Sequence, residues 1–135
     1  MRPSARLIAI WVFVGIYASA IFTFSSLSDP PVPTFNFSNI DKVYHALEYA
    51  ALAFLLMCAL RTTFPTRSTT QLILWGVALT VLYGCSDEFH QAFTPGREMS
   101  VYDALADAVG AGLVGLVWTK MERRWPASVN SAREE

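Results

Sequence analysis

Four apolar segments, separated by short polar stretches, organise this chain. Residues 7–24 carry no charged side chain, and neither do residues 49–60, 71–85 and 108–118. An uncharged run of about 18 or more residues can span a bilayer, and the shorter runs reach that length when their polar flanks are included. A soluble bundle is the alternative, but these segments lack the polar face that it needs. The pattern predicts an all-α fold, a four-helix transmembrane bundle with helices at about 7–24, 41–61, 71–92 and 101–121.

The basic residues indicate how this bundle is oriented. Eight of the ten Lys and Arg residues would share one side of the membrane: Arg2, Arg6, Arg61, Arg67, Lys120, Arg123, Arg124 and Arg133. An excess of Lys and Arg in short loops marks the cytoplasmic face. We therefore predict an N-in/C-in topology, with a transmembrane domain at 1–121 and a polar cytoplasmic tail at 122–135.

The first apolar segment also has features of a secretory signal peptide. Two arginines precede it, and "ASA" at 18–20 resembles a cleavage site. However, the uncharged run continues to Phe24, which is longer than the ~7–15 residues of a signal core. We therefore expect the first helix to be retained.

Polar residues gather at the opposite, extracytoplasmic end of the predicted helices. In helix 41–61, Asp41, His45 and Glu48 follow the spacing i, i+4, i+7, which places them on one face. The same spacing relates Gly84, Glu88 and Gln91 in the third helix, and Asp103, Asp107 and Gly110 in the fourth. Three helices can therefore direct polar faces towards a common point.

Helix capping explains only part of this set. Asp41 and Asp103 each follow a serine by three residues, as in a capping box, so stabilising a helix N-terminus would account for them. His45, Glu48 and Asp107 lie at least one turn further inside. A charge in a transmembrane segment costs at least ~2.5 kcal/mol at its centre, so such residues usually face a partner or a water-filled cavity.

Two interpretations of these inner residues remain open. One is a purely structural network in which Lys42 or Arg97 bridges the carboxylates. The other, which we favour because carboxylates outnumber bases, is a shared ligand-binding pocket open to the outer leaflet. Its predicted residues are Asp41, Lys42, His45, Glu48, Tyr49, Glu88, Gln91, Arg97, Asp103 and Asp107.

Small residues also recur along two of the predicted helices. They are Ala104, Ala108, Gly112 and Gly115 in the fourth, and Ala46, Ala50 and Ala53 in the second. Small residues allow helix backbones to approach closely within a bilayer. We therefore expect these stripes to serve helix packing, and we assign the glycines no chemistry.

A metal site is a further alternative, because imidazole and carboxylate together suit zinc and similar divalent ions. The spacings in "HALE" and "DEFH" match no strong metal signature, so we expect no cofactor and retain a divalent metal as the alternative. The chain contains no HExxH, GxSxG, P-loop, GxGxxG or nucleic-acid-binding motif. No reaction and no nucleic-acid partner is indicated.

Three stretches together resemble the successive signatures of VanZ-like membrane proteins. They are "DKVYHALEYAALAFLL", "YGCSDEFHQAFTPGR" and "SVYDALADAVGAGLVG", and the resemblance extends over about residues 22–116. It implies a small multi-pass helical protein of the bacterial cytoplasmic membrane, with a link to resistance against the glycopeptide teicoplanin. The family pattern falls on Asp41, Lys42, His45, Tyr49, Glu88, Gln91, Pro95, Gly96, Arg97, Asp103 and Asp107.

Two classes of function fit these residues. The first is a binding module for an anionic envelope ligand, such as a membrane lipid head group, a lipid-linked envelope precursor or a glycopeptide, with Arg97 and Lys42 contacting the anion. The second is an intramembrane enzyme acting on an envelope lipid, with His45 and Glu88 as general base and acid, with or without a metal. We favour the binding module because no nucleophile–base motif is recognisable. Transport is disfavoured, since the inner halves of the helices carry almost no polar residue beyond Cys58 and Thr119.

Overall fold

The computed structural model of the protein describes residues 4–28 and 39–124, and these residues form helices and no strand. The four helices are α1 (Ala5–Ser25), α2 (Ile40–Thr63), α3 (Thr69–Gln91) and α4 (Val101–Arg124). All four are long and apolar enough to cross a membrane, which confirms the predicted fold class. Helix α4 continues three residues into the expected polar tail, and residues 125–135 of that tail lie outside the described residues.

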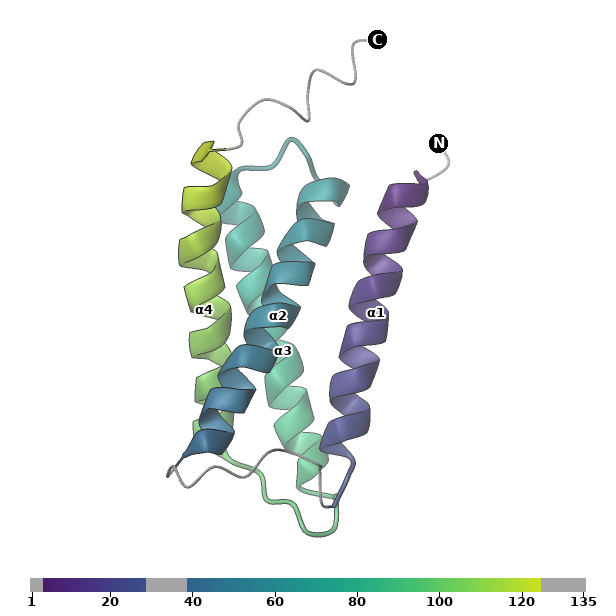
Figure 1. Ribbon diagram of the computed structural model, residues 1–135, viewed down its shortest axis with the longest axis vertical. Helices are drawn as coiled ribbons and strands as arrows, with labels where there is room; N and C mark the ends of the chain where they lie inside the picture. Colours follow the sequence, from purple (N-terminus) through teal and green to yellow (C-terminus); the bar gives the residue numbers. More distant parts are fainter. Residues whose placement is uncertain (1–3, 29–38, 125–135) are drawn as a thin grey trace.

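The helices run alternately up and down, so that each lies roughly antiparallel to the next in sequence (Figure 1). Helix α1 begins, and α4 ends, beside the 64–68 turn between α2 and α3. We call this the terminal end. The other end, where α2 and α4 begin and segment 92–100 follows α3, we call the cluster end. The predicted up-down arrangement therefore places both described chain ends on one side of the bundle.

Polar caps fix several of the helix starts. At α3, Ser68 and Gln71 form a complete capping box, in which each side chain bonds to the other residue's backbone N–H. At α4, Ser100 Oγ accepts a hydrogen bond from Asp103 N at 3.3 Å, as the spacing predicted. The reciprocal bond, however, comes from another helix, because Ser100 N donates to Glu88 Oε2 at 2.7 Å. The cap of α4 is thereby joined to the ionisable residues.

The predicted cap of α2 differs from the structure in what can be described. Ser38 lies outside the described residues. The N-cap position of α2 is Asn39, which adopts a left-handed conformation with φ of 67° and makes no side-chain capping bond. Asparagine tolerates this conformation better than most residues with a side chain.

Helices α2 and α3 each contact the other three helices, and α2 is the centre of the bundle because its contacts are the more extensive. Its span is 39% buried, against 11% for the span of α1. The buried side chains of α2 include Tyr49, Leu52 and Met57, which are almost fully inaccessible. Helices α2, α3 and α4 therefore form the packed unit, and α1 lies at its side (Figure 1).

Helices α2 and α4 approach to backbone contact at Gly110. A Cβ atom added there would lie 2.0 Å from the carbonyl oxygen of Ala46, so only glycine fits. The predicted packing role of the small residues is confirmed for Gly115, where a Cβ would meet the Ile73 side chain of α3 at 2.8 Å, and is wrong for Gly112, where a Cβ would meet nothing within 4 Å. Gly110 and Gly112 are two positions apart and therefore point about 200° apart on the helix. The packing face is instead the face of Asp103, Asp107 and Gly110.

Candidate functional site: an ionisable cluster buried between α2, α3 and α4

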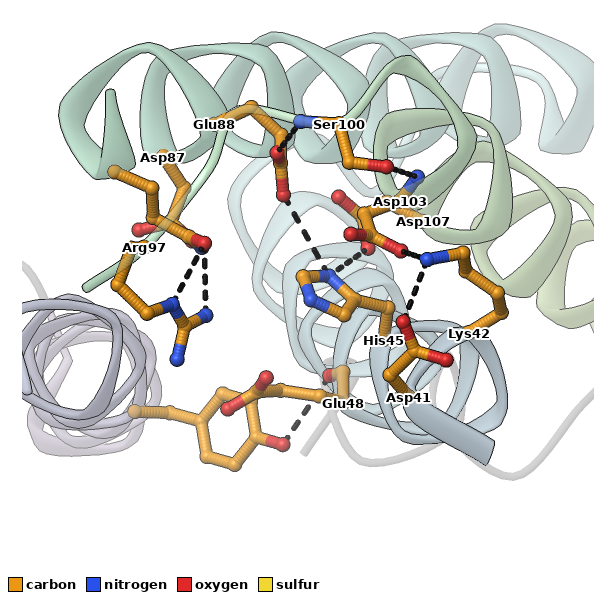
Figure 2. Close-up of polar contacts among 12 residues, drawn as sticks. Asp41, Lys42, His45, Glu48, Asp87, Glu88, Arg97, Ser100, Asp103 and Asp107 are labelled. Atoms are coloured by element: carbon orange, nitrogen blue, oxygen red, sulfur yellow. Dashed lines mark hydrogen bonds and ion pairs between the residues drawn. The ribbon is translucent and has the colours of Figure 1, made fainter. Parts of the chain in front are cut away.

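The centre of the site consists of one ionisable side chain from each of three helices. His45 of α2 places Nδ1 3.1 Å from Asp107 Oδ1 of α4 and 3.9 Å from Glu88 Oε1 of α3 (Figure 2). The side chains of Glu88 and Asp107 are only 4% and 1% exposed. We call these three residues the central triad. The structure thus brings together residues that are between 19 and 62 positions apart in the sequence.

Local features hold the triad in place. Ser100 N donates to Glu88 Oε2, which ties the carboxylate to the start of α4. One turn before Glu88, Gly84 leaves space for Asp107, since a Cβ there would lie 2.7 Å from Asp107 Oδ2 and 3.2 Å from the Tyr49 ring. Gly84 and Glu88 were predicted from the sequence to share one face of α3, and on that face Gly84 makes room for Asp107.

Several buried polar atoms at this end have no hydrogen-bond partner among residues 4–28 and 39–124. They are Tyr49 Oη, Asp87 Oδ1, Glu88 Oε1 and Asp107 Oδ2. Leaving such an atom unsatisfied in a buried position costs about 1–3 kcal/mol, and more for a charged group. The triad therefore has unused acceptor capacity directed between the helices.

Lys42 lies in a second group at the mouth of the cluster. Its Nζ is 2.7 Å from Asp103 Oδ1 and 2.6 Å from Asp41 Oδ2. The predicted helix-capping carboxylates thus also form ion pairs, and the ammonium charge is shared between them. This geometry leaves Lys42 poorly placed to contact an external anion.

Arg97 belongs to a third group, built on the "TPGR" turn. Arg97 N bonds to Thr94 O at 3.1 Å, and Gly96 has a φ of 79°, which is the conformation that a turn with glycine in its third position requires. The turn directs the guanidinium back to α3, where Nε and Nη2 donate to Gln91 Oε1 at 3.2 and 2.7 Å. Gln91 Nε2 donates in turn to Asp87 Oδ2 at 2.9 Å.

Asp87 is the main residue absent from the predicted site. Its position near the end of α3 was compatible with a solvated loop, yet its side chain is buried and bonded to Gln91. The signal was available, because Asp87 precedes Gln91 by four residues and therefore shares its face. His90, the second histidine, points elsewhere. Its ring stacks on Phe22 and its Nε2 lies 3.0 Å from Ser26 Oγ, so it joins α3 to α1.

Tyr49 and Glu48 complete the predicted set in different ways. The Tyr49 side chain is fully buried, and its ring lies parallel to that of His45 with centroids 6.4 Å apart. Glu48 lies apart from the triad in Figure 2, and its backbone carbonyl accepts a hydrogen bond from Tyr17 of α1. The predicted residues therefore divide into the triad with Tyr49 beside it, the Lys42 group, the Arg97 group and a separate Glu48.

The charge balance of this end is strongly acidic. Among the described residues, the basic side chains are Lys42, His45, His90 and Arg97, whereas the carboxylates are Asp41, Glu48, Asp87, Glu88, Glu98, Asp103 and Asp107. Charges interact more strongly away from bulk water. The site as a whole therefore favours a ligand that brings positive charge or hydrogen-bond donors.

Four apolar spans with ionisable side chains buried between them define a multi-pass membrane protein, in which intramembrane ionisable residues usually mark a functional site. The chain belongs to the VanZ/LLP1 family, whose model matches residues 4–121, in agreement with the resemblance seen in the sequence. No curated protein and no solved structure gives a significant match. The family match does not point to a cofactor. One ligand atom from each member of the triad lies within 4.8 Å of the others, as in metal sites.

Proposed function

We propose that the protein is a membrane-embedded binding module of the bacterial cell envelope, and that its cluster end binds the anionic head group of an envelope lipid. The observation that carries this proposal is the position of Arg97. Its guanidinium bonds to Gln91 Oε1, which is a neutral acceptor, and it makes no ion pair within 4.0 Å among the described residues. The cluster end coincides with the ends of the spans, where head groups lie.

Arg97 suits this role chemically. A guanidinium carries five N–H donors in a planar fork that matches phosphate oxygens, and the bonds to Gln91 use two of them. Lys42, the other predicted anion contact, is held between two carboxylates. We therefore assign recognition of the anion chiefly to Arg97, with the buried acceptors orienting the donor groups of the head group.

Lipid binding can be measured directly on the purified protein in a neutral detergent. Short-chain phosphatidate and short-chain phosphatidylcholine are titrated against wild type and Arg97→Gln. We expect preference for phosphatidate in the wild type, and a loss of about tenfold or more in Arg97→Gln, since a hydrogen bond to a charged group contributes ~1.5–3 kcal/mol. Arg97→Lys should recover only part of the affinity, because an ammonium lacks the fork.

The matched control is Arg67→Gln, which removes an exposed guanidinium at the terminal end, where Arg67 lies over the Trp75 ring. Phosphatidate binding should not change in this variant. Equal binding of the two lipids by the wild type, or equal losses in the two variants, would overturn the proposal.

The proposal includes an orientation, with the terminal end in the cytoplasm and the cluster end outside. Its support is the basic residues of the terminal end. Single cysteines at Ser28 and Thr66, both exposed, can be introduced into a chain without Cys58 and Cys85. In intact cells, an impermeant thiol reagent should label position 28 and spare position 66. The reverse pattern, or equal labelling, would contradict this orientation.

The proposal also includes a link to teicoplanin, which rests on the family alone. Expression in a susceptible bacterium should raise the inhibitory concentration of teicoplanin, and Arg97→Gln should abolish the rise while Arg67→Gln retains it. An unchanged inhibitory concentration with wild-type protein present in the membrane would remove this part and leave lipid binding to be judged separately.

A second function is favoured by one specific contact, the 3.1 Å approach of His45 Nδ1 to Asp107 with Glu88 alongside. A histidine oriented by a carboxylate is the arrangement of a general base, so an intramembrane enzyme acting on an envelope lipid is the alternative. Glu88→Gln keeps the shape and the hydrogen-bonding capacity but removes a proton-transfer group. In chelator-treated protein, this variant should largely retain phosphatidate binding in either case, and only an enzyme has a turnover for it to lose.

A further inference from the structure

The central triad presents a problem for a pocket that receives an anion. Glu88 and Asp107 are almost fully buried, and each has one oxygen without a hydrogen-bond partner in the described part of the chain. Two ionised carboxylates would repel a phosphate group bound beside them. The Lys42 ammonium does not offset this, because Asp41 and Asp103 already flank it.

The separations within the triad match those between ligands of one metal ion. Two ligands at ~2.1 Å from a tetrahedral ion are about 3.4 Å apart. His45 Nδ1 lies 3.1 Å from Asp107 Oδ1 and 3.9 Å from Glu88 Oε1, and the three ligand atoms lie within 4.8 Å of one another. Small side-chain adjustments would therefore bring all three onto a common ion.

The surroundings also support such a site. Ser100 N occupies Glu88 Oε2 and leaves Oε1 directed at the triad (Figure 2). Gly84 provides the space in which Asp107 Oδ2 lies. The unpartnered oxygens are an observation separate from the clustering of acidic residues, and they leave acceptor capacity for a bound species.

We propose that His45, Glu88 and Asp107 bind a divalent transition-metal ion of the zinc class, and that its remaining coordination position receives an anionic oxygen of the head group. The second part of this inference rests on the proposed function, whereas the metal site itself does not. One imidazole and two carboxylates suit Zn²⁺ better than Mg²⁺ or Ca²⁺, which prefer oxygen-only sites with more ligands.

The ion explains how an acidic pocket accepts an anion. Its two positive charges offset those of Glu88 and Asp107, and three protein ligands leave a tetrahedral ion one open position. Arg97 would then contact the same head group from the turn, while the triad holds the metal. The carboxylates of this end would thus hold a cation, and the cation would in turn bind the negatively charged head group.

The test uses the full-length protein in neutral detergent, stripped of metal by a chelator and freed of lipid. Equilibrium dialysis against Zn²⁺, with elemental analysis, should show one ion per chain, with Mg²⁺ binding far more weakly. Co²⁺ as a second probe should give visible absorption bands typical of low coordination number. Glu88→Gln, Asp107→Asn and His45→Gln should each weaken Zn²⁺ binding by about tenfold or more, since even outer groups of metal sites contribute 10–100-fold.

The control variant is Glu98→Gln, which removes an exposed carboxylate at the same end, outside the triad. Its Zn²⁺ affinity should equal that of the wild type. Each variant is first checked for wild-type helicity and elution, and the wild-type stoichiometry decides the question if a variant fails this check. Less than stoichiometric Zn²⁺ in the wild type, or a loss equal in Glu98→Gln and the triad variants, would overturn the metal site.

Adding short-chain phosphatidate separates this inference from the function on which its second part rests. We expect phosphatidate to bind more tightly to the Zn²⁺-loaded protein than to the stripped protein. Stoichiometric Zn²⁺ without any phosphatidate binding would refute the lipid function and leave the metal site standing. Phosphatidate binding that is identical with and without Zn²⁺ would refute the bridging role alone.

Discussion

The two ends of the bundle solve the same problem, placing charged groups near a membrane, in different ways. At the terminal end, Arg61 pairs with Glu122 of α4, and its remaining donors reach Arg67 O at 3.0 Å and Thr69 Oγ1 at 3.2 Å. Thr69 Oγ1 itself donates to Glu122. One cation, one anion and one hydroxyl thus satisfy each other in a closed network that joins α2, α3 and α4.

The cluster end joins the same three helices but leaves its network open. There His45 faces both Glu88 and Asp107, and an oxygen of each carboxylate has no hydrogen-bond partner among the residues described. A network in which every polar group has a partner is explained by its structural role in joining the helices. A network with unpartnered carboxylate oxygens costs several kcal/mol to bury, which indicates that these oxygens bind a ligand.

The largest effect on this comparison should come from Gly110→Ala, which separates the helices that carry the triad. The new methyl group would meet the Ala46 backbone at 2.0 Å, and a backbone cannot move aside as a side chain can. We expect a loss of at least about 3 kcal/mol in the free energy of unfolding, at or beyond the upper end for overpacking. Denaturation in mixed micelles, followed by circular dichroism, measures it.

Gly112→Ala is the matched control in the same helix, because nothing lies within 4 Å of its added Cβ. Alanine is the better helix former by about 0.8–1 kcal/mol, so this variant should be at least as stable as the wild type. Similar losses in the two variants would contradict the close α2–α4 contact.

Gly84→Ala should act next in size and on the triad itself. Its methyl group would meet Asp107 Oδ2 at 2.7 Å and the Tyr49 ring at 3.2 Å, and the Asp107 side chain would have to shift. We expect a loss of about 1–3 kcal/mol in the free energy of unfolding. A double-mutant cycle with Asp107→Ala measures the coupling, since the alanine removes the nearest atom. Purely additive losses would show that Gly84 does not make room for Asp107.

Glu122→Gln should open the closed network of the terminal end. Arg61 would lose its carboxylate partner while remaining partly buried, with 30% of its side chain exposed. We expect a loss of about 1 kcal/mol in the free energy of unfolding, because partial exposure screens the pair. Phosphatidate binding and Zn²⁺ binding should not change. Altered ligand binding in this variant would contradict the separation of the two ends.

Glu88→Gln should have the smallest effect on the unliganded fold, and of the opposite sign. It removes a charge from an acid-rich site, and the glutamine carbonyl can still accept the bond from Ser100 N. In metal-free detergent we expect the free energy of unfolding to be unchanged or up to about 1 kcal/mol higher. A clear loss of stability would indicate that the cluster end is closed by internal pairing, like the terminal end.

The sequence by itself determined the spans and the faces. Uncharged runs predicted four helices close to their observed bounds, because in a bilayer the backbone must satisfy itself within each segment. The i, i+4, i+7 spacing predicted that His45, Glu88 and Asp107 belong to inward faces, because the helical repeat fixes side-chain direction. The sequence alone also showed that carboxylates outnumber basic residues on these faces.

Only the tertiary structure decided which partners these residues meet. The rotation of α4 placed Gly110, and not Gly112, against α2, and thereby put Asp107 beside His45. The fold also pairs Lys42 with Asp103, bonds Glu88 to the backbone N–H of Ser100, and places His90 against the end of α1. Such pairings depend on how ridges and small residues of separate helices interlock, and no local pattern encodes the angle at which two helices meet.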